Sequence, residues 1–324
     1  MLELGRRLRR LRQEKSQVFE PRCLLEEETM SRPIPYSYPL NFDKNRAVEL
    51  ASLIDAAYQQ LVDFRNHVAW TVPGPRNVKP QHYQIVPSDG LSAPKTYQIE
   101  AEFYSIENWG LPGPSAKSAV PFGFVATAGT DAYVVIRGTQ TPLEWLDDAT
   151  VEHVPFAPDA AAPGKTWGVT TKGFDGLYGQ IIPGIIAALQ KLKNANDLSS
   201  LFVTGHSLGA ALAHLVAAGI KTHLGLNPIS YTFSGPRTGD PAFAQAFLAS
   251  GLQTWRIINT EDIVPAVPIS SNQLGRTTAT SIFLNTLIRG LPAGFSHIGY
   301  PIAVTFDRNR VDDNHNLDNL WATL

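Results

Sequence analysis

Residues 201–215, LFVTGHSLGAALAHL, place a serine between two glycines where a strand pattern gives way to a helix pattern. The apolar, β-favouring stretch before GHSLG is typical of a buried strand, and the alanines after it are typical of a closely packed helix. A strand that turns directly into a helix indicates an α/β fold. The turn leaves so little room that we expect a side chain at Gly205 or Gly209 to collide with a neighbouring strand or helix.

Strand and helix patterns alternate along most of the remaining chain. We expect helices over residues 45–64, 173–193, 207–224, 240–250 and 316–324. We expect strands over residues 95–106, 122–128, 132–138, 198–205, 229–235, 254–260 and 297–307. Asp240 and Pro241 form a start signal for the helix at 240–250. Alternation of this kind predicts an α/β fold with a mostly parallel central sheet and helices on both faces.

Composition excludes several classes of protein. The 324 residues carry 27 basic and 29 acidic side chains, so the net charge of about -2 gives no electrostatic case for binding nucleic acid. No run of about 18 apolar residues is present, so we expect no transmembrane segment. Cys23 is the only cysteine and cannot form an intramolecular disulfide. With no secretory signal recognisable, we expect a cytoplasmic protein, although secretion by another route stays open.

The first residues of the chain are rich in arginine. We expect residues 1–31 to form a basic, disordered tail, and residues 32–324 to form a single domain. Two alternatives concern this tail: it could form a short helix that touches a membrane surface or a partner, or translation could begin at Met30.

Ser207 is the candidate nucleophile. It occupies the centre of Gly205-His206-Ser207-Leu208-Gly209, which matches the G-x-S-x-G pattern of serine hydrolases. The turn raises the hydroxyl above the sheet, and the N–H groups at the start of the following helix favour developing negative charge. A serine hydroxyl needs a general base, and that base needs an orienting group.

Catalytic groups gather at the carboxyl ends of parallel strands, which directs the search for an acid. Glu261 and Asp262 follow the strand at 254–260, and we favour Asp262 because the apolar residues after it should draw it inward. Asp240 is accounted for as a helix cap.

Two histidines remain candidates for the base. His214 is expected to pack against the sheet and His223 to be exposed at a helix end. His297 precedes the last strand and so lies at its amino end, whereas His315 follows that strand on a loop that can reach back over the sheet. We favour His315, with His297 as the alternative.

The chain resembles the class 3 lipases, a family that includes the fungal triacylglycerol lipases. The resemblance covers about residues 95–320 and rests on blocks in the same order: VVIRGTQTPLEWLDD, VTGHSLGAALA, YTFSGPRTGDPAFA, INTEDIVPAVP, GFSHIGYPIAVTF and DNHNLDNLW. It implies an α/β-hydrolase fold and a catalytic triad of Ser207, Asp262 and His315. It also supports His315 over His297, because the family places its histidine after the last strand. The fungal members contain disulfides, which this chain cannot form.

The resemblance also implies an oxyanion hole and a lid. The oxyanion would be bound by the N–H groups of Thr139 and Leu208, with Arg137 and Gly138 fixing the loop. The lid would be a short helix within residues 141–156, followed by a loop over 157–165. Its apolar residues would contact the substrate or a lipid–water interface: Leu143, Trp145 and Leu146.

These observations predict a serine hydrolase that cleaves carboxylic esters of lipids, such as triacylglycerols, through an acyl-enzyme. No metal or organic cofactor is expected, because no His/Cys cluster has metal-ligand spacing. The alternatives are a soluble short-chain esterase, a phospholipase of the A1 type, a feruloyl-type esterase, and a non-catalytic regulatory module. The oligomeric state stays open.

Overall fold

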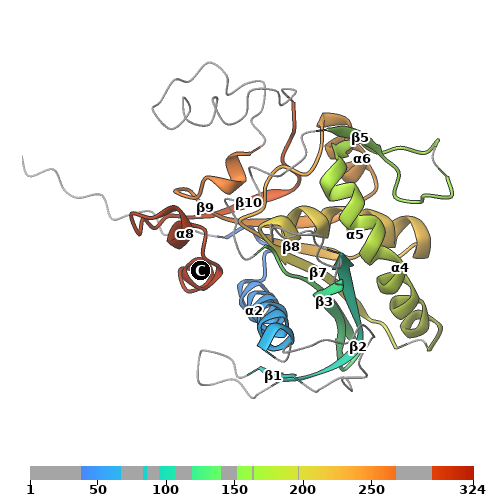
Figure 1. Cartoon of the computed structure of the whole chain (residues 1–324), viewed down its shortest axis with the longest axis horizontal. Helices are drawn as coiled ribbons and strands as arrows, with labels where there is room; N and C mark the ends of the chain where they lie inside the picture. The colour runs from blue at the N-terminus through green and yellow to red at the C-terminus, as the bar shows by residue number, and fades with distance from the viewer. Residues whose placement is uncertain are drawn as a thin grey trace, which may run out of the picture. The chain divides into compact units, whose positions relative to one another are not determined.

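The computed structural model describes residues 38–66, 83–85, 95–106, 119–139, 152–162, 164–195, 197–267 and 294–324. Contacts between residues divide the chain into two units, 1–40 and 41–324, and the architecture below is that of the second unit (Figure 1). The predicted tail at 1–31 lies outside the described residues. None of the described helices is long and apolar enough to cross a membrane.

An eight-stranded sheet forms the centre of the molecule, in the order β1-β2-β3-β4-β7-β8-β9-β10. The strands are β1 (Tyr83–Ile85), β2 (Lys95–Ile106), β3 (Ala119–Ala128), β4 (Asp131–Ile136), β7 (Ser200–His206), β8 (Ile229–Phe233), β9 (Gln253–Asn259) and β10 (Tyr300–Val304). β4, β7, β8, β9 and β10 pair in parallel, whereas β1 to β4 are antiparallel. The predicted α/β fold with a mostly parallel sheet is confirmed.

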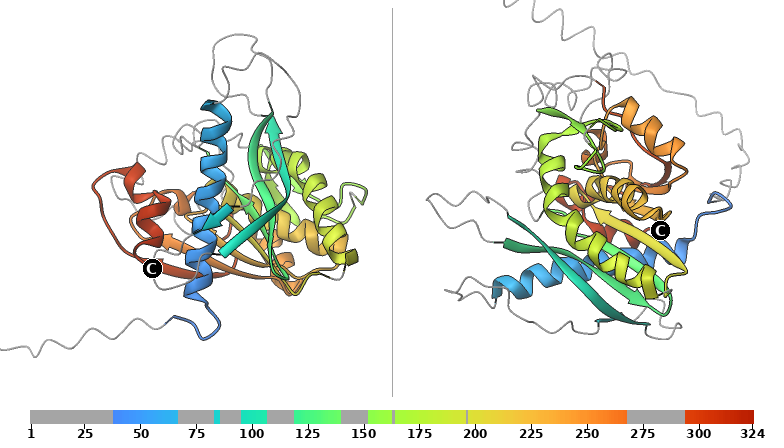
Figure 2. Two further views of the ribbon diagram at one scale, coloured as in Figure 1. Left: turned by 90° about the horizontal axis from the view of Figure 1, so that it is seen from below. Right: turned by 90° about the vertical axis from the view of Figure 1, so that its right-hand side faces the viewer.

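Helices cover both faces of the sheet, as predicted (Figure 2). The first face is covered by α2 (Lys44–Asn66), which also contacts α9 (Leu317–Trp321). The second face is covered by α4 (Lys172–Ala195) and α5 (Leu208–Leu224), with α6 (Pro241–Ala249) beside them. The main apolar core lies between this second group of helices and the sheet. α5 is buried along almost its whole length, which its small side chains permit.

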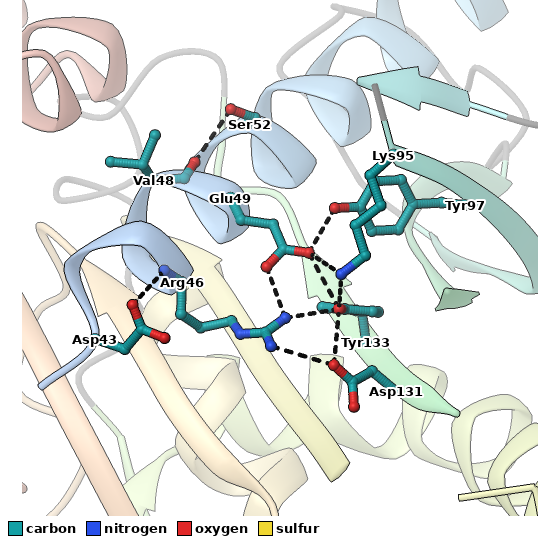
Figure 3. A network of polar contacts seen from close by, with 9 residues as sticks. All are labelled: Asp43, Arg46, Val48, Glu49, Ser52, Lys95, Tyr97, Asp131 and Tyr133. Carbon is teal, nitrogen blue, oxygen red and sulfur yellow. Dashed lines mark hydrogen bonds and ion pairs between the residues drawn. The ribbon is translucent and has the colours of Figure 1, made fainter. Parts of the chain in front are cut away.

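A polar network fastens the first turns of α2 to the sheet (Figure 3). The Glu49 carboxylate accepts hydrogen bonds from Lys95 and Tyr97 of β2, each at 2.6 Å. Arg46 pairs with Glu49 at 2.6 Å and with Asp131 at the start of β4 at 3.1 Å. Because α2 is a single helix, this anchor also fixes its later turns, one of which reaches the candidate active site.

One prediction about the lid segment is wrong. Residues 153–156 form a strand, β5 (His153–Phe156), which pairs antiparallel with β6 (Gly168–Thr171). Pro155 explains the difference, because proline lacks the N–H that a helix interior needs and is tolerated at a sheet edge. The predicted loop at 157–165 has no helix or strand in its described part. Leu143, Trp145 and Leu146 lie outside the described residues, so the lid remains a prediction.

Candidate active site

Ser207 connects β7 to α5 in a strained conformation. Its φ of 56° and ψ of -126° are rare for a residue with a Cβ atom. A hydrogen bond holds the strained turn in place: the Ser207 N–H donates to the Phe233 carbonyl of β8 at 2.9 Å. The hydroxyl is buried and has no hydrogen-bond partner. The sharp turn predicted for this serine is therefore present.

The glycines on either side of Ser207 are required by space, as predicted. A Cβ atom at Gly205 would lie 2.2 Å from the carbonyl oxygen of Gly209. A Cβ atom at Gly209 would lie 2.5 Å from the carbonyl oxygen of Ile136 in β4. Both obstacles are backbone atoms of packed elements, so they cannot move aside.

Asp262 lies just after β9, and its side chain is fully buried. Its Oδ1 accepts a hydrogen bond from the Val264 N–H at 2.9 Å, and its Oδ2 lies 2.8 Å from Nδ1 of His315. Glu261, the alternative acid, is exposed. Asp240 caps α6 as predicted, accepting from a first-turn N–H at 2.8 Å. Of these three acids, Asp262 is therefore the one that the structure hydrogen-bonds to a histidine.

His315 lies between the short helix α8 (Val311–Asn314) and α9, and only 2% of its surface is exposed. The loop is fastened to β9, because the Asn259 side chain donates to the Asn314 carbonyl at 3.0 Å. With Nδ1 directed at Asp262, the other ring nitrogen, Nε2, is buried and has no partner.

His297 lies in a different environment. Burial, together with the nearby positive charges of Arg256 and Arg237, lowers its pKa to about 3. None of the described carboxylates is hydrogen-bonded to it. The structure thus pairs Asp262 with His315 and places His297 beside arginines. His214 packs against the sheet, as predicted.

The predicted oxyanion loop passes directly against the serine. A Cβ atom at Gly138 would lie 2.9 Å from the Cβ of Ser207. Thr139 follows and is buried, and its Oγ1 has no hydrogen-bond partner. Leu208 begins α5, so its N–H has no acceptor within the helix. Arg137 fixes the loop as expected, donating to a β3 carbonyl at 2.8 Å and to the Gly138 carbonyl at 2.7 Å.

A chain of hydrogen bonds that the sequence did not predict joins the parts of this site. The Gly138 N–H donates to the Tyr58 hydroxyl of α2 at 3.0 Å. The same hydroxyl lies 2.9 Å from Nδ1 of His206, the residue before the serine. Nε2 of His206 lies 2.9 Å from the carbonyl oxygen of His315. The oxyanion loop, the serine turn and the histidine loop are therefore tied to one another.

The direction of each hydrogen bond in this chain follows from chemistry. The His315 carbonyl can only accept, so Nε2 of His206 carries a proton. Burial, and then the neighbouring His315, lower the pKa of His206 well below its usual value, so the ring is neutral and Nδ1 accepts. Tyr58 must then donate to Nδ1 while its oxygen accepts from Gly138. Burial raises the pKa of the Tyr58 hydroxyl, which keeps its proton in place.

A sequence signal for Tyr58 was present but weak. Tyr58 stands four residues after Ile54 and three before Leu61, on the apolar stripe of α2. A tyrosine on such a stripe often uses its hydroxyl for a buried hydrogen bond. The partner of that hydroxyl, however, could not be read from the spacing.

The arrangement as a whole is suited to acyl transfer. Among the described side-chain atoms that are buried without a partner, three belong to this site: Ser207 Oγ, His315 Nε2 and Thr139 Oγ1. They are the atoms that would attack a carbonyl, accept the serine proton and approach an oxyanion. Within the described ranges, no group of three or more metal-ligating side chains occurs.

Comparison with known proteins agrees with this geometry. Residues 133–272 match the family model for lipase (class 3). Over these residues the chain is similar to the class 3 lipase family. It is 34% identical over 140 residues to a lipase from Rhizomucor miehei, an alignment that covers 42% of this chain and 37% of the relative. It is 36% identical over 151 residues to phospholipase A(1) DAD1, chloroplastic, from Arabidopsis thaliana, covering 43% and 34%.

The match to solved structures concerns the fold. The crystal structure of MDLA from Penicillium cyclopium superposes with a TM-score of 0.52 at 19% identity, covering 82% of this chain and 80% of that one. The chain therefore shares the α/β fold of that structure. It spans between about a third and about half of the length of the curated relatives that it matches.

Proposed function

We propose that this class 3 lipase-family chain is a serine hydrolase that cleaves carboxylic esters of lipids. The observation that carries the proposal is the pairing of buried Asp262 with His315 beside a strained, unpartnered Ser207. Supporting it, His206, the residue before Ser207, is hydrogen-bonded to the His315 carbonyl, and Ser207 and Asp262 both follow the carboxyl ends of parallel strands, where catalytic groups are found.

The reaction begins when Ser207 Oγ attacks the carbonyl carbon of the ester while Nε2 of His315 takes its proton. Asp262 accepts the hydrogen bond from Nδ1, which sets the tautomer and stabilises the imidazolium. The tetrahedral oxyanion accepts hydrogen bonds from the N–H groups of Thr139 and Leu208. The bond to the alcohol then breaks, and His315 gives the alcohol its proton.

Water completes the reaction by the same route. His315 removes a proton from the water as its oxygen attacks the acyl-enzyme, and the serine leaves with that proton as the fatty acid forms. In the structure, neither Ser207 Oγ nor His315 Nε2 makes a hydrogen bond. Hydrogen bonds between catalytic groups commonly tighten only when substrate is bound.

A fluorophosphonate probe tests the nucleophile directly. The folded chain should be labelled, and Ser207→Ala should abolish labelling. Ser234→Ala is a matched control, because Ser234 also follows a strand with a positive φ of 48° and has a buried, unpartnered hydroxyl. Absence of labelling in the folded wild-type chain, or labelling that survives in Ser207→Ala, would contradict the proposal.

The substrate class is supported by the relatives, one named a lipase and another a phospholipase A(1). We therefore expect hydrolysis of triacylglycerol emulsions, with phospholipid cleavage at one acyl position as the second candidate. Rates on both, and on p-nitrophenyl esters of increasing chain length, separate these activities. Activity confined to short, soluble esters would favour a soluble esterase and exclude a lipase.

A further inference from the structure

A group of polar side chains lies inside the molecule, on the sheet face that α5 covers. Ser230 and Thr232 of β8 stand beside Thr254 and Arg256 of β9 in the parallel register. On the same face the adjoining strand β7 presents Val203, next to Ser230, to the apolar core. Sheet faces that helices cover are normally lined by apolar residues. Four neighbouring polar side chains on a sheet face that a helix covers are therefore unusual.

Four donor atoms of this group have no acceptor. Arg256 is only 7% exposed, and its Nε and Nη1 atoms are buried without a hydrogen-bond partner. The hydroxyls of Ser230 and Thr232 are buried and unpartnered as well. Buried polar groups are nearly always hydrogen-bonded, and a buried charge is nearly always compensated. A partner for these donors must accept hydrogen bonds and carry negative charge.

A second guanidinium makes the local charge more positive. Arg237, in the loop after β8, is 5% exposed and fastens the segment after Asp262, since its Nη1 donates to the Ala266 carbonyl. Burial, and then Arg237, lower the pKa of Arg256 to about 10. Arg256 therefore stays protonated at neutral pH, and the buried charge remains.

The described groups that act on Arg256 carry no negative charge. His214 of α5 is hydrogen-bonded to the hydroxyls of Thr238 and Thr254, at 2.8 and 3.2 Å. Burial lowers the pKa of His214 and of His297 to about 3, so both rings are neutral. In the described part of the chain no carboxylate raises the pKa of Arg256. Residues 268–293, which follow Arg237's contact segment, contain no Asp or Glu.

We propose that this group binds one small inorganic anion of the size of chloride. The anion accepts hydrogen bonds from Nε and Nη1 of Arg256 and from the hydroxyls of Thr232 and Ser230. A spherical monovalent ion suits this site, because its donors come from two adjacent strands and all of them are buried. An ordered water could accept the same hydrogen bonds but would leave the charge uncompensated.

Anomalous scattering from crystals of the wild-type chain grown in bromide tests the site directly. We expect a bromide peak within hydrogen-bond distance of the Arg256 guanidinium and of Thr232 Oγ1. A water molecule at that position without anomalous signal, or a carboxylate of the chain itself, would overturn the proposal.

Thermal unfolding in solution gives a second, independent test. At constant ionic strength, replacing gluconate by chloride should raise the wild-type midpoint by roughly 2–3 °C for each tenfold increase above the dissociation constant. Arg256→Met should lose this dependence, and in gluconate it should be at least as stable as the wild type, because an uncompensated charge is gone. Lys191→Met, which removes an exposed cation of α4, should keep the dependence.

Equal midpoints for the wild-type chain in chloride and gluconate would also overturn the proposal. This wild-type comparison and the bromide crystal decide the matter even where Arg256→Met does not fold. Neither measurement depends on enzymatic activity, so the anion proposal and the proposal for Ser207 are tested independently.

Discussion

Replacing Tyr58 by phenylalanine removes one oxygen atom from the chain of hydrogen bonds that joins the three loops of the candidate active site. The change leaves the Gly138 N–H and Nδ1 of His206 without their partner. Tyr58 contacts neither the serine hydroxyl nor the ring nitrogen that would take its proton, so it acts as a positioning residue. Loss of its hydroxyl should lower activity because the oxyanion loop is displaced.

The structure allows the size of the effect to be worked out. A buried group that loses its partner costs about 1–3 kcal/mol, and both Gly138 and His206 are buried. We therefore expect the free energy of unfolding to fall by about 2 kcal/mol, which lowers the midpoint by roughly 3–4 °C. Loss of one oxyanion donor costs a factor of about 10²–10³ in kcat, and a displaced donor should cost less, about 10–100-fold.

The assay is steady-state hydrolysis of a soluble p-nitrophenyl ester, with thermal unfolding measured on the same samples. Because the oxyanion exists only in the transition state, kcat and kcat/KM should fall together while KM stays within about twofold. Tyr104→Phe is the control, since Tyr104 of β2 is exposed and its hydroxyl donates to Glu102. A Tyr58→Phe enzyme with wild-type kcat, or one whose loss lies entirely in KM, would refute the reasoning.

Three further predictions follow from the same structure. Gly138→Ala should reduce kcat by at least about 100-fold. The reason is that the new Cβ would lie 2.5 Å from the Tyr58 hydroxyl and 2.7 Å from the His206 carbonyl oxygen. Gly176→Ala, whose Cβ would meet nothing within 4 Å, should retain full activity. Asp262→Asn should lower kcat by roughly 10³–10⁴-fold without unfolding the chain, since the histidine loses its orienting acceptor; activity within tenfold of wild type would exclude Asp262 as the orienting residue. The pKa values of His206, His214 and His297 are lowered in the folded state, so below about pH 6.5 the unfolded chain binds protons that the folded chain does not. As the pH falls, each of these three histidines should therefore lower the free energy of unfolding by up to about 1.4 kcal/mol per pH unit. Denaturant titrations between pH 7 and 4 that show constant stability would contradict this.

Features that depend on local backbone constraints could be predicted from the sequence. The G-x-S-x-G turn carries its own geometric requirement, and the structure finds both glycines where no Cβ atom fits. The cap at Asp240 was predictable for the same reason, because a carboxylate before Pro241 can satisfy N–H groups of the turn that follows. The strand at 153–156 was missed because a short apolar segment does not reveal whether a partner strand is available.

The sequence by itself determined the fold class and the turn that holds Ser207. It also limited the candidates for the catalytic acid and the catalytic histidine to a few residues. Only the tertiary structure decided which of them meet: it directs His315 toward Asp262 and places His297 beside Arg256 and Arg237. The contacts of Tyr58 and the buried, unpartnered donors of Arg256 also appear only there. The physical reason is that periodicity and turn chemistry act over a few residues. Hydrogen bonds between elements join groups as much as 148 residues apart, and their partners are set by how the sheet and its helices come together.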